Sequence, residues 1–150
     1  MSQSSTPTYT ISATLSLAYP AAGGAVRSAL ADQGFGVLTE IDLAATMKAK
    51  LDKDLPPQLI LGACRPPLAY QALQADPSVA ALLPCNVVVR QLDAGSTLVE
   101  AFDPQAMLSF STSPAIGAIA ADARSRLQSA INALGSAHPV SATEREGESS

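Results

Sequence analysis

Two cysteines, Cys64 and Cys85, are the residues of this sequence best suited to carry chemistry. We expect Cys64 where a strand ends and a helix begins, next to Arg65, and both the helix start and the cation favour a thiolate. Cys85 is expected at the start of the following strand. If these two strands run antiparallel, both thiols lie at one edge of the sheet; if they run parallel, the thiols lie at opposite edges.

Two thiols at one edge could bind a soft metal such as Cu(I) or Zn(II), or cycle as a dithiol. Two protein ligands leave a tetrahedral zinc site incomplete within one chain. The alternative is that Cys64 and Cys85 only fill space, because unpaired cysteine is among the most buried residue types. The sequence leaves both interpretations open.

A second group of polar residues forms a candidate ligand-binding set: Glu40, Asp42, Lys48, Asn86 and Asp103. Glu40 lies on a predicted strand, and a carboxylate there that points at partly buried surface would have a raised pKa suited to acid–base chemistry. Structural roles compete with this hypothesis. Asp42 is placed to cap a helix and Asp103 to begin a turn before a proline.

Few other residues or motifs in the sequence could support catalysis, metal binding or cofactor binding. The only histidine, His138, lies in a polar C-terminal stretch, which argues against histidine-based nucleophilic triads and histidine-rich metal sites. No phosphate-binding glycine–lysine loop is present, and residues 34–36 (GFG) do not make a dinucleotide fingerprint. The sequence therefore gives no support for a nucleotide cofactor and leaves any other cofactor open. Tyr70 and Met107 are candidates to line a pocket, although packing roles are the commoner use of such residues.

The elements that position these residues follow from periodicity and from the proline and glycine positions. Alternating or apolar runs predict strands at 9–17, 36–41, 58–63, 85–92 and 97–102. Helical spacing predicts helices over 20–33, 43–51, 66–76 and 114–134, the last one capped by Ser113 and stopped by Gly135. Residues 93–96 (DAGS) predict a hairpin between the last two strands. The order β-α-β-(α)-β-α-β-β-α predicts an α+β fold with a mixed, mainly antiparallel sheet.

The length of 150 residues predicts a single domain. We expect a flexible segment at 1–8, a globular domain at 9–135 and a disordered polar tail at 136–150. The N-terminus lacks the features of a signal peptide, so a cytoplasmic location is predicted. The net charge of −4 and the single lysine cluster, Lys48, Lys50 and Lys53, predict no nucleic-acid partner. No apolar run is long enough to span a membrane, so no membrane partner is expected.

Four strings in the chain resemble a known family: GFGVLTEIDLAATMKAKL at 34–51, LGACRPPLAYQALQ at 61–74, LLPCNVVV at 82–89 and FDPQAM at 102–107. They are similar to the bacterial and archaeal domain-of-unknown-function family numbered 302. The resemblance runs from about Tyr9 to Leu134. It implies a TATA-binding-protein-like fold, an antiparallel sheet with helices on one side, and a small homodimer. It implies no particular reaction.

From the residues we predict a non-enzymatic binding module that holds a small ligand or a soft metal near Cys64 and Cys85. One alternative is a thiol-dependent or carboxylate-dependent enzyme, so catalysis is left open. Another alternative is a structural homodimer without any ligand. A ligand should raise the melting temperature of a binding module by mass action, whereas an enzyme should lose turnover on alkylation.

Overall fold

The computed structural model describes residues 9–140 and contains one five-stranded sheet. Its strands are β1 (Thr10–Leu15), β2 (Gly36–Asp42), β3 (Gln58–Cys64), β4 (Cys85–Asp93) and β5 (Ser96–Phe102). The spatial order is β1-β5-β4-β3-β2, and each neighbouring pair is antiparallel. The predicted α+β class with a mainly antiparallel sheet is confirmed.

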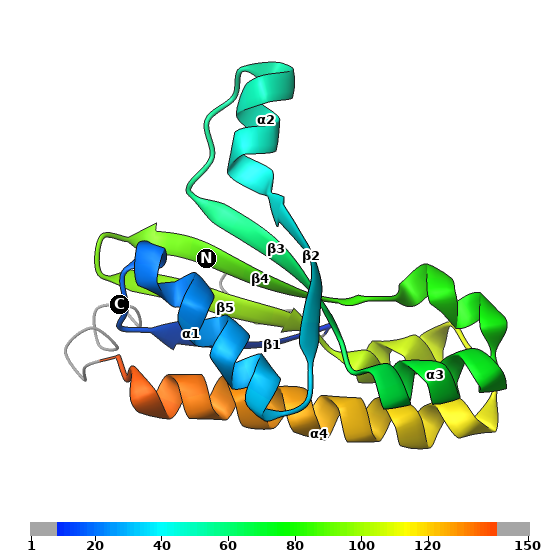
Figure 1. Ribbon diagram of the computed structural model, residues 1–150. Helices are drawn as coiled ribbons and strands as arrows, with labels where there is room; N and C mark the ends of the chain where they lie inside the picture. The colour runs from blue at the N-terminus through cyan, green and yellow to red at the C-terminus, as the bar shows by residue number, and fades with distance from the viewer. Residues whose placement is uncertain (1–8, 141–150) are drawn as a thin grey trace, which may run out of the picture.

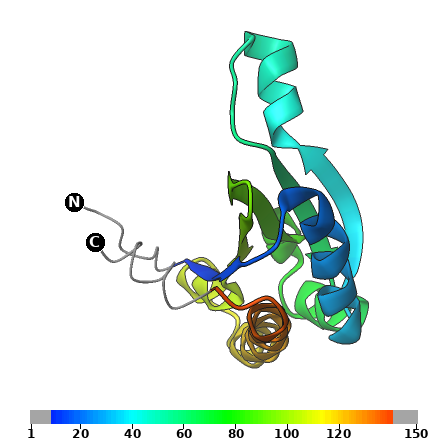
Figure 2. The same cartoon turned by 90° about the vertical axis from the view of Figure 1, so that its left-hand side faces the viewer.

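Helices α1 (Tyr19–Asp32) and α4 (Pro114–Ala137) cover one face of this sheet (Figures 1 and 2). Strand alternation directs every second residue toward them. The fully buried core joins both layers: Leu15, Val26, Leu30, Leu61, Val87, Val89, Val99 and Leu127. Helix α3 (Pro66–Ala75) and a 3-10 turn, η1 (Pro77–Leu82), pack at one end of α4 together with a second 3-10 turn, η2 (Pro104–Ser109). None of the helices in residues 9–140 is long and apolar enough to cross a membrane.

Helix α4 follows its predicted apolar stripe but differs from the prediction at both ends. Six residues of the stripe are buried: Ile116, Ala120, Leu127, Ala130, Ile131 and Leu134. Ser113 occupies the N-cap position, yet its side chain makes no capping hydrogen bond. The helix also continues through Gly135 to Ala137, and the carbonyl of His138 accepts a hydrogen bond from the Ser16 amide at 2.9 Å. Packing of the final turn against β1 outweighs the weak helix propensity of one glycine. The proposed flexible segment 1–8, and residues 141–150 of the proposed tail at 136–150, lie outside the described residues.

A protruding arm, which we define as residues 38–57, extends beyond the body of the domain (Figures 1 and 2). It contains most of β2, helix α2 (Leu43–Leu51) and the connection to β3. Asp42 caps α2 as predicted, because its carboxylate accepts a hydrogen bond from the Ala45 amide at 2.8 Å. None of the α2 residues is buried. Hence Leu43, Met47 and Leu51, which recur at helical spacing along α2, do not form a buried face within one chain.

Candidate functional site

The two cysteines lie at the same edge of the sheet, as an antiparallel arrangement requires. Strand β3 ends at Cys64, β4 begins at Cys85, and the register places Ala63 directly opposite Cys85. Strand spacing then separates the Cα atoms of the two cysteines by about 6 Å. Both are free cysteines. The prediction that they are neighbours is confirmed.

A cavity of about 40 Å³ lies between the β3–α3 junction, the start of β4, η2 and α4. Cys64, Cys85 and Met107 are among its wall residues, and Arg65 is the only charged residue in the described part of the wall. Apolar side chains from α3 and α4 complete the wall. One water needs roughly 10–15 Å³ of such space, so the cavity accommodates an ion or a ligand of very few atoms.

Burial keeps both thiols protonated near neutral pH. Cys85 is only 8% exposed, and its burial, with a smaller contribution from the charge of Cys64, raises its pKa to about 11. Burial also raises the pKa of Cys64 above the ordinary value of 9.0. The expectation that the helix start and Arg65 would favour a Cys64 thiolate is therefore wrong. Desolvation disfavours the charged form more strongly than these two features favour it.

Arg65 enters the cavity wall because it occupies the position just before α3. Its side chain crosses the turn after α1 at Gly34, where a φ of 84° suits glycine and a Cβ would lie 3.0 Å from Arg65 Nε. That Nε is buried and has no hydrogen-bond partner. A buried donor without an acceptor costs roughly 1–3 kcal/mol. Arg65 therefore contributes to the cavity wall while its Nε lies buried beside Gly34.

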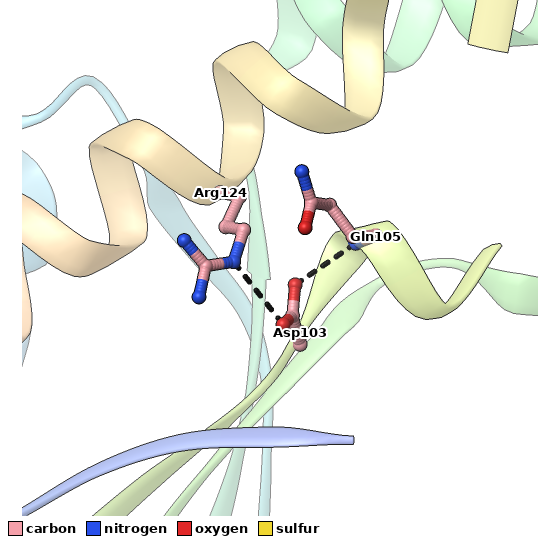
Figure 3. A network of polar contacts seen from close by, with 3 residues as sticks. All are labelled: Asp103, Gln105 and Arg124. Atoms are coloured by element: carbon pink, nitrogen blue, oxygen red, sulfur yellow. Dashed lines mark hydrogen bonds and ion pairs between the residues drawn. The ribbon is translucent and has the colours of Figure 1, made fainter. Parts of the chain in front are cut away.

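Met107 is held in the wall by a polar brace at the start of η2 (Figure 3). The carboxylate of Asp103 accepts a hydrogen bond from the Gln105 amide at 2.9 Å and an ion-paired one from Arg124 Nε at 3.1 Å. This brace ties η2 to α4. Asp103, predicted to bind a ligand, does not line the cavity but positions the segment that carries Met107.

The remaining predicted polar residues do not join the cysteines. Asn86 is exposed, and alternation along β4 turns it to the face of the sheet opposite Cys85. It lines a separate shallow groove with Pro84 and Phe102. Tyr70 is 64% exposed and lies outside the cavity wall, whereas Met107 is part of it.

Glu40 and Asp42 lie together at the base of the arm, where they line an open groove. Glu40 pairs with Arg27 and is 49% exposed, so the expected partly buried carboxylate is not found. Lys48 instead pairs with Asp52 at 3.0 Å and Asp54 at 3.2 Å. The predicted set of five polar residues is therefore divided among three places in the fold.

The carboxylates of Asp42 and Glu40 contribute to a shift in the pKa of Tyr19. The pKa of the Tyr19 hydroxyl is raised, first by burial and then by the charges of Asp42 and Glu40. An anionic phenolate there would be close to two negative charges. Tyr19 therefore stays a neutral hydroxyl over a wide pH range.

Sequence reasoning noted Arg65 and Met107 separately and did not place them in one site. The sequence offered only indirect indications that these residues share a cavity wall. Arg65 is a cation directly after Cys64, and Met107 lies in a turn that follows the last strand. Within residues 9–140, histidine, cysteine, aspartate and glutamate form no group of three or more that could hold a metal ion. A metal at the two cysteines would need its third protein ligand from another residue type.

Together these features define a small α+β domain with an antiparallel sheet, one helix-covered face and a sulfur-lined cavity at a sheet edge. The model of the family described as "Domain of unknown function DUF302" matches residues 11–134, and the chain belongs to this family. A crystal structure of an uncharacterized conserved DUF302 protein from Bacillus stearothermophilus is similar, with a TM-score of 0.78 and 26% identity. The match covers 85% of this chain and 99% of that one. No curated protein matches the sequence.

Proposed function

We propose that this domain is a non-enzymatic binding module that holds a small ligand or a soft metal ion near Cys64 and Cys85. The observation that carries the proposal is the small cavity whose wall contains both cysteines, Met107 and Arg65. Its volume of about 40 Å³ suits an ion or a ligand of few atoms. Two unpaired thiols also suit a reducing compartment such as the cytoplasm.

The lining favours binding over catalysis. Among the described wall residues there is no aspartate, glutamate or histidine that could act as a general base for a thiol nucleophile. Burial also raises the pKa of both thiols, which is opposite to the activation that a catalytic cysteine needs. A thiol-dependent enzyme is therefore the weaker hypothesis.

The test measures occupancy of the cavity directly. Reduced protein is labelled with iodoacetamide alone or with Zn(II), Cd(II) or Cu(I), and each cysteine is quantified by peptide mass spectrometry. Native mass spectrometry of the same preparation reports any co-purified molecule. We expect at least one probe, or a co-purified molecule, to slow labelling of both cysteines. If no probe protects them and the protein carries no bound mass, the proposal is wrong.

We also propose that the domain is a homodimer formed through the arm. The arm exposes four large apolar side chains, Leu38 (64%), Ile41 (46%), Leu51 (63%) and Leu55 (40%), and α2 buries none of its residues. A short helix without tertiary packing is marginal in water, so a partner surface would stabilise it. Asp42 and Lys50 of the arm form no ion pair among the described residues, and a two-fold interface can pair such opposite charges twice.

Sedimentation of the intact protein tests this arrangement. We expect a dimer that Leu51→Glu converts to monomer, because the charge would be buried without a partner. Leu51 is exposed within one chain, so the substitution leaves each protomer folded. Leu108→Glu, on η2 and 49% exposed, is the matched control and should stay dimeric. A monomeric native protein, or a dimer insensitive to Leu51→Glu, contradicts the proposal.

A further inference from the structure

The face of the sheet opposite α1 and α4 carries apolar side chains that no helix covers within residues 9–140 (Figures 1 and 2). We call it the open face. Strand alternation away from the buried core places four half-buried or exposed apolar residues there: Ile41, Ile60, Val88 and Leu98. The register pairs Ile41 with Ile60 and Ile60 with Val88, so these three form one cross-strand row from β2 to β4. Covering this row would remove apolar surface from water.

The charged residues on the central strands of the open face are already paired. Arg90 of β4 and Glu100 of β5 lie on this face and pair with each other at 4.0 Å. Glu100 also accepts a hydrogen bond from the Thr10 hydroxyl at 3.0 Å. A buried charge without a partner is costly, and this pair avoids that cost when the face is covered. The open face is therefore suited to a mainly apolar partner surface.

The arm presents an apolar surface of this kind, but not to the sheet of its own chain. Both views show the arm rising away from α4, and α2 mainly contacts β2 and β3, the strands that lead into and out of it (Figures 1 and 2). Leu51 and Leu55 stay 63% and 40% exposed. Ile41 belongs both to the arm and to the row on the open face, so the two apolar surfaces are continuous. Within one chain both surfaces remain uncovered.

Contact area decides between two ways in which the arms of two copies could associate. Helix α2 has nine residues and is about 14 Å long. Two helices of that length that touch only each other bury on the order of a few hundred Å². A specific interface needs roughly 1,000 Å² or more. If each arm instead lies on the sheet of the other copy, one association includes two arm–sheet contacts, and this larger contact is the one that a stable dimer needs.

We infer that the arm of each copy lies across the open face of a second copy, with Leu51 packed against Ile60 of the partner subunit. This inference rests on the proposed homodimer and names the surface that the arm contacts. Arm and open face then form one self-complementary patch, so a two-fold axis satisfies both contacts and association stops at two copies. The sheet of each copy gains a helix on its second face, which completes the layered packing of its apolar side chains.

Cross-linking between two copies tests which surface the arm contacts. Full-length protein with photoreactive p-benzoylphenylalanine in place of Leu51 is mixed with isotope-labelled native protein, and mass spectrometry identifies peptides that join the two. We expect position 51 to cross-link to β3 and β4 of the labelled copy. Cross-links only to residues 38–57 of the labelled copy overturn the inference, because the arms then contact each other, and the proposed homodimer stands. A monomeric native protein overturns both.

A substitution on the open face tests the other side of the contact. Ile60→Glu places a charge in the middle of the apolar row, where the partner's arm would bury it. Sedimentation should show that it raises the dissociation constant of the dimer by about 100-fold or more. If the arms contacted only each other, this substitution would leave the dimer unchanged.

The matched control is Thr14→Glu, which also replaces a half-buried β-branched residue on the open face. Thr14 lies on β1, the edge strand farthest from the arm, so this variant should dimerise as the native protein does. Circular dichroism and melting temperature verify that both variants are folded. If folded Ile60→Glu dimerises like Thr14→Glu, the inference is wrong. If Ile60→Glu does not fold, the cross-links from position 51, which leave the open face native, decide the question.

Discussion

At the scale of single residues, burial rather than local charge controls the chemistry of this domain. Cys64 sits beside an arginine and just before a helix, and both features favour a thiolate. Desolvation nevertheless raises the pKa of Cys64, and it raises the pKa of the more deeply buried Cys85 further. A ligand that coordinates these sulfurs therefore has to displace protons from neutral thiols.

The raised pKa of Cys85 predicts how stability depends on alkaline pH. The thiol ionises near 9.0 in the unfolded chain and near 11 in the folded one. Its protonated form therefore stabilises the fold fully below pH 9, and this contribution is lost as the pH rises from 9 to 11. Urea unfolding at several pH values should show a steeper loss for the native protein than for Cys85→Ala. Equal slopes for the two proteins would contradict the prediction.

At the scale of elements, the sheet edge that carries the cysteines depends on a close approach at Gly62. This residue precedes Ala63 on β3, and its missing side chain leaves space for Thr39 of β2 and Pro84 before β4. A Cβ at Gly62 would lie 2.8 Å from Pro84 Cγ and would overlap Thr39 Oγ1. The neighbouring strands can therefore approach β3 only because position 62 is glycine.

Gly62→Ala should destabilise the protein by about 1–3 kcal/mol, the usual cost of overpacking. Thr39→Ala in the same chain should recover part of this loss, because it removes one of the two clashing groups while Pro84 remains. Gly36→Ala is the matched control in β2, where an added Cβ meets nothing within 4 Å. Denaturant unfolding of the variants measures the free energies. A Gly62→Ala variant as stable as Gly36→Ala would show that the strands can relax.

At the scale of the whole molecule, α4 joins the parts into one unit. It contacts β1, α1, α3 and η2, and so it links the sheet to the cavity end of the domain. Its central core residue, Leu127, is completely buried. The arm is the contrasting part, since it has no core of its own and α2 makes only few contacts outside it.

Leu127→Ala should lower the free energy of unfolding by about 2–5 kcal/mol, because it removes buried surface and leaves a cavity between α4 and the sheet. Leu108→Ala, at a position that is 49% exposed, should cost much less. Thermal and denaturant unfolding of both variants give the comparison. A loss below about 1 kcal/mol for Leu127→Ala would mean that another face of α4 carries the core.

The sequence by itself determined the elements, and the hairpin at 93–96 together with the family resemblance favoured an antiparallel sheet in which the cysteines are neighbours. Alternation in the strands, the apolar stripe of α4 and the turn at 93–96 are local patterns, and local patterns reflect backbone geometry directly. Antiparallel pairing of β3 with β4 then brings Cys64 close to Cys85 without further information. The N-cap role of Asp42 was predictable for the same local reason.

Only the tertiary structure decided which side chains share the cavity and which do not. Met107 and Arg65 belong to the same cavity wall as the cysteines because η2 is braced to α4 and because Gly34 leaves space for the arginine. Both conditions involve residues far apart in sequence. The raised pKa of Cys64 likewise follows from burial by several elements. Burial and long-range contacts depend on how whole elements pack, and no local pattern of residues encodes that packing.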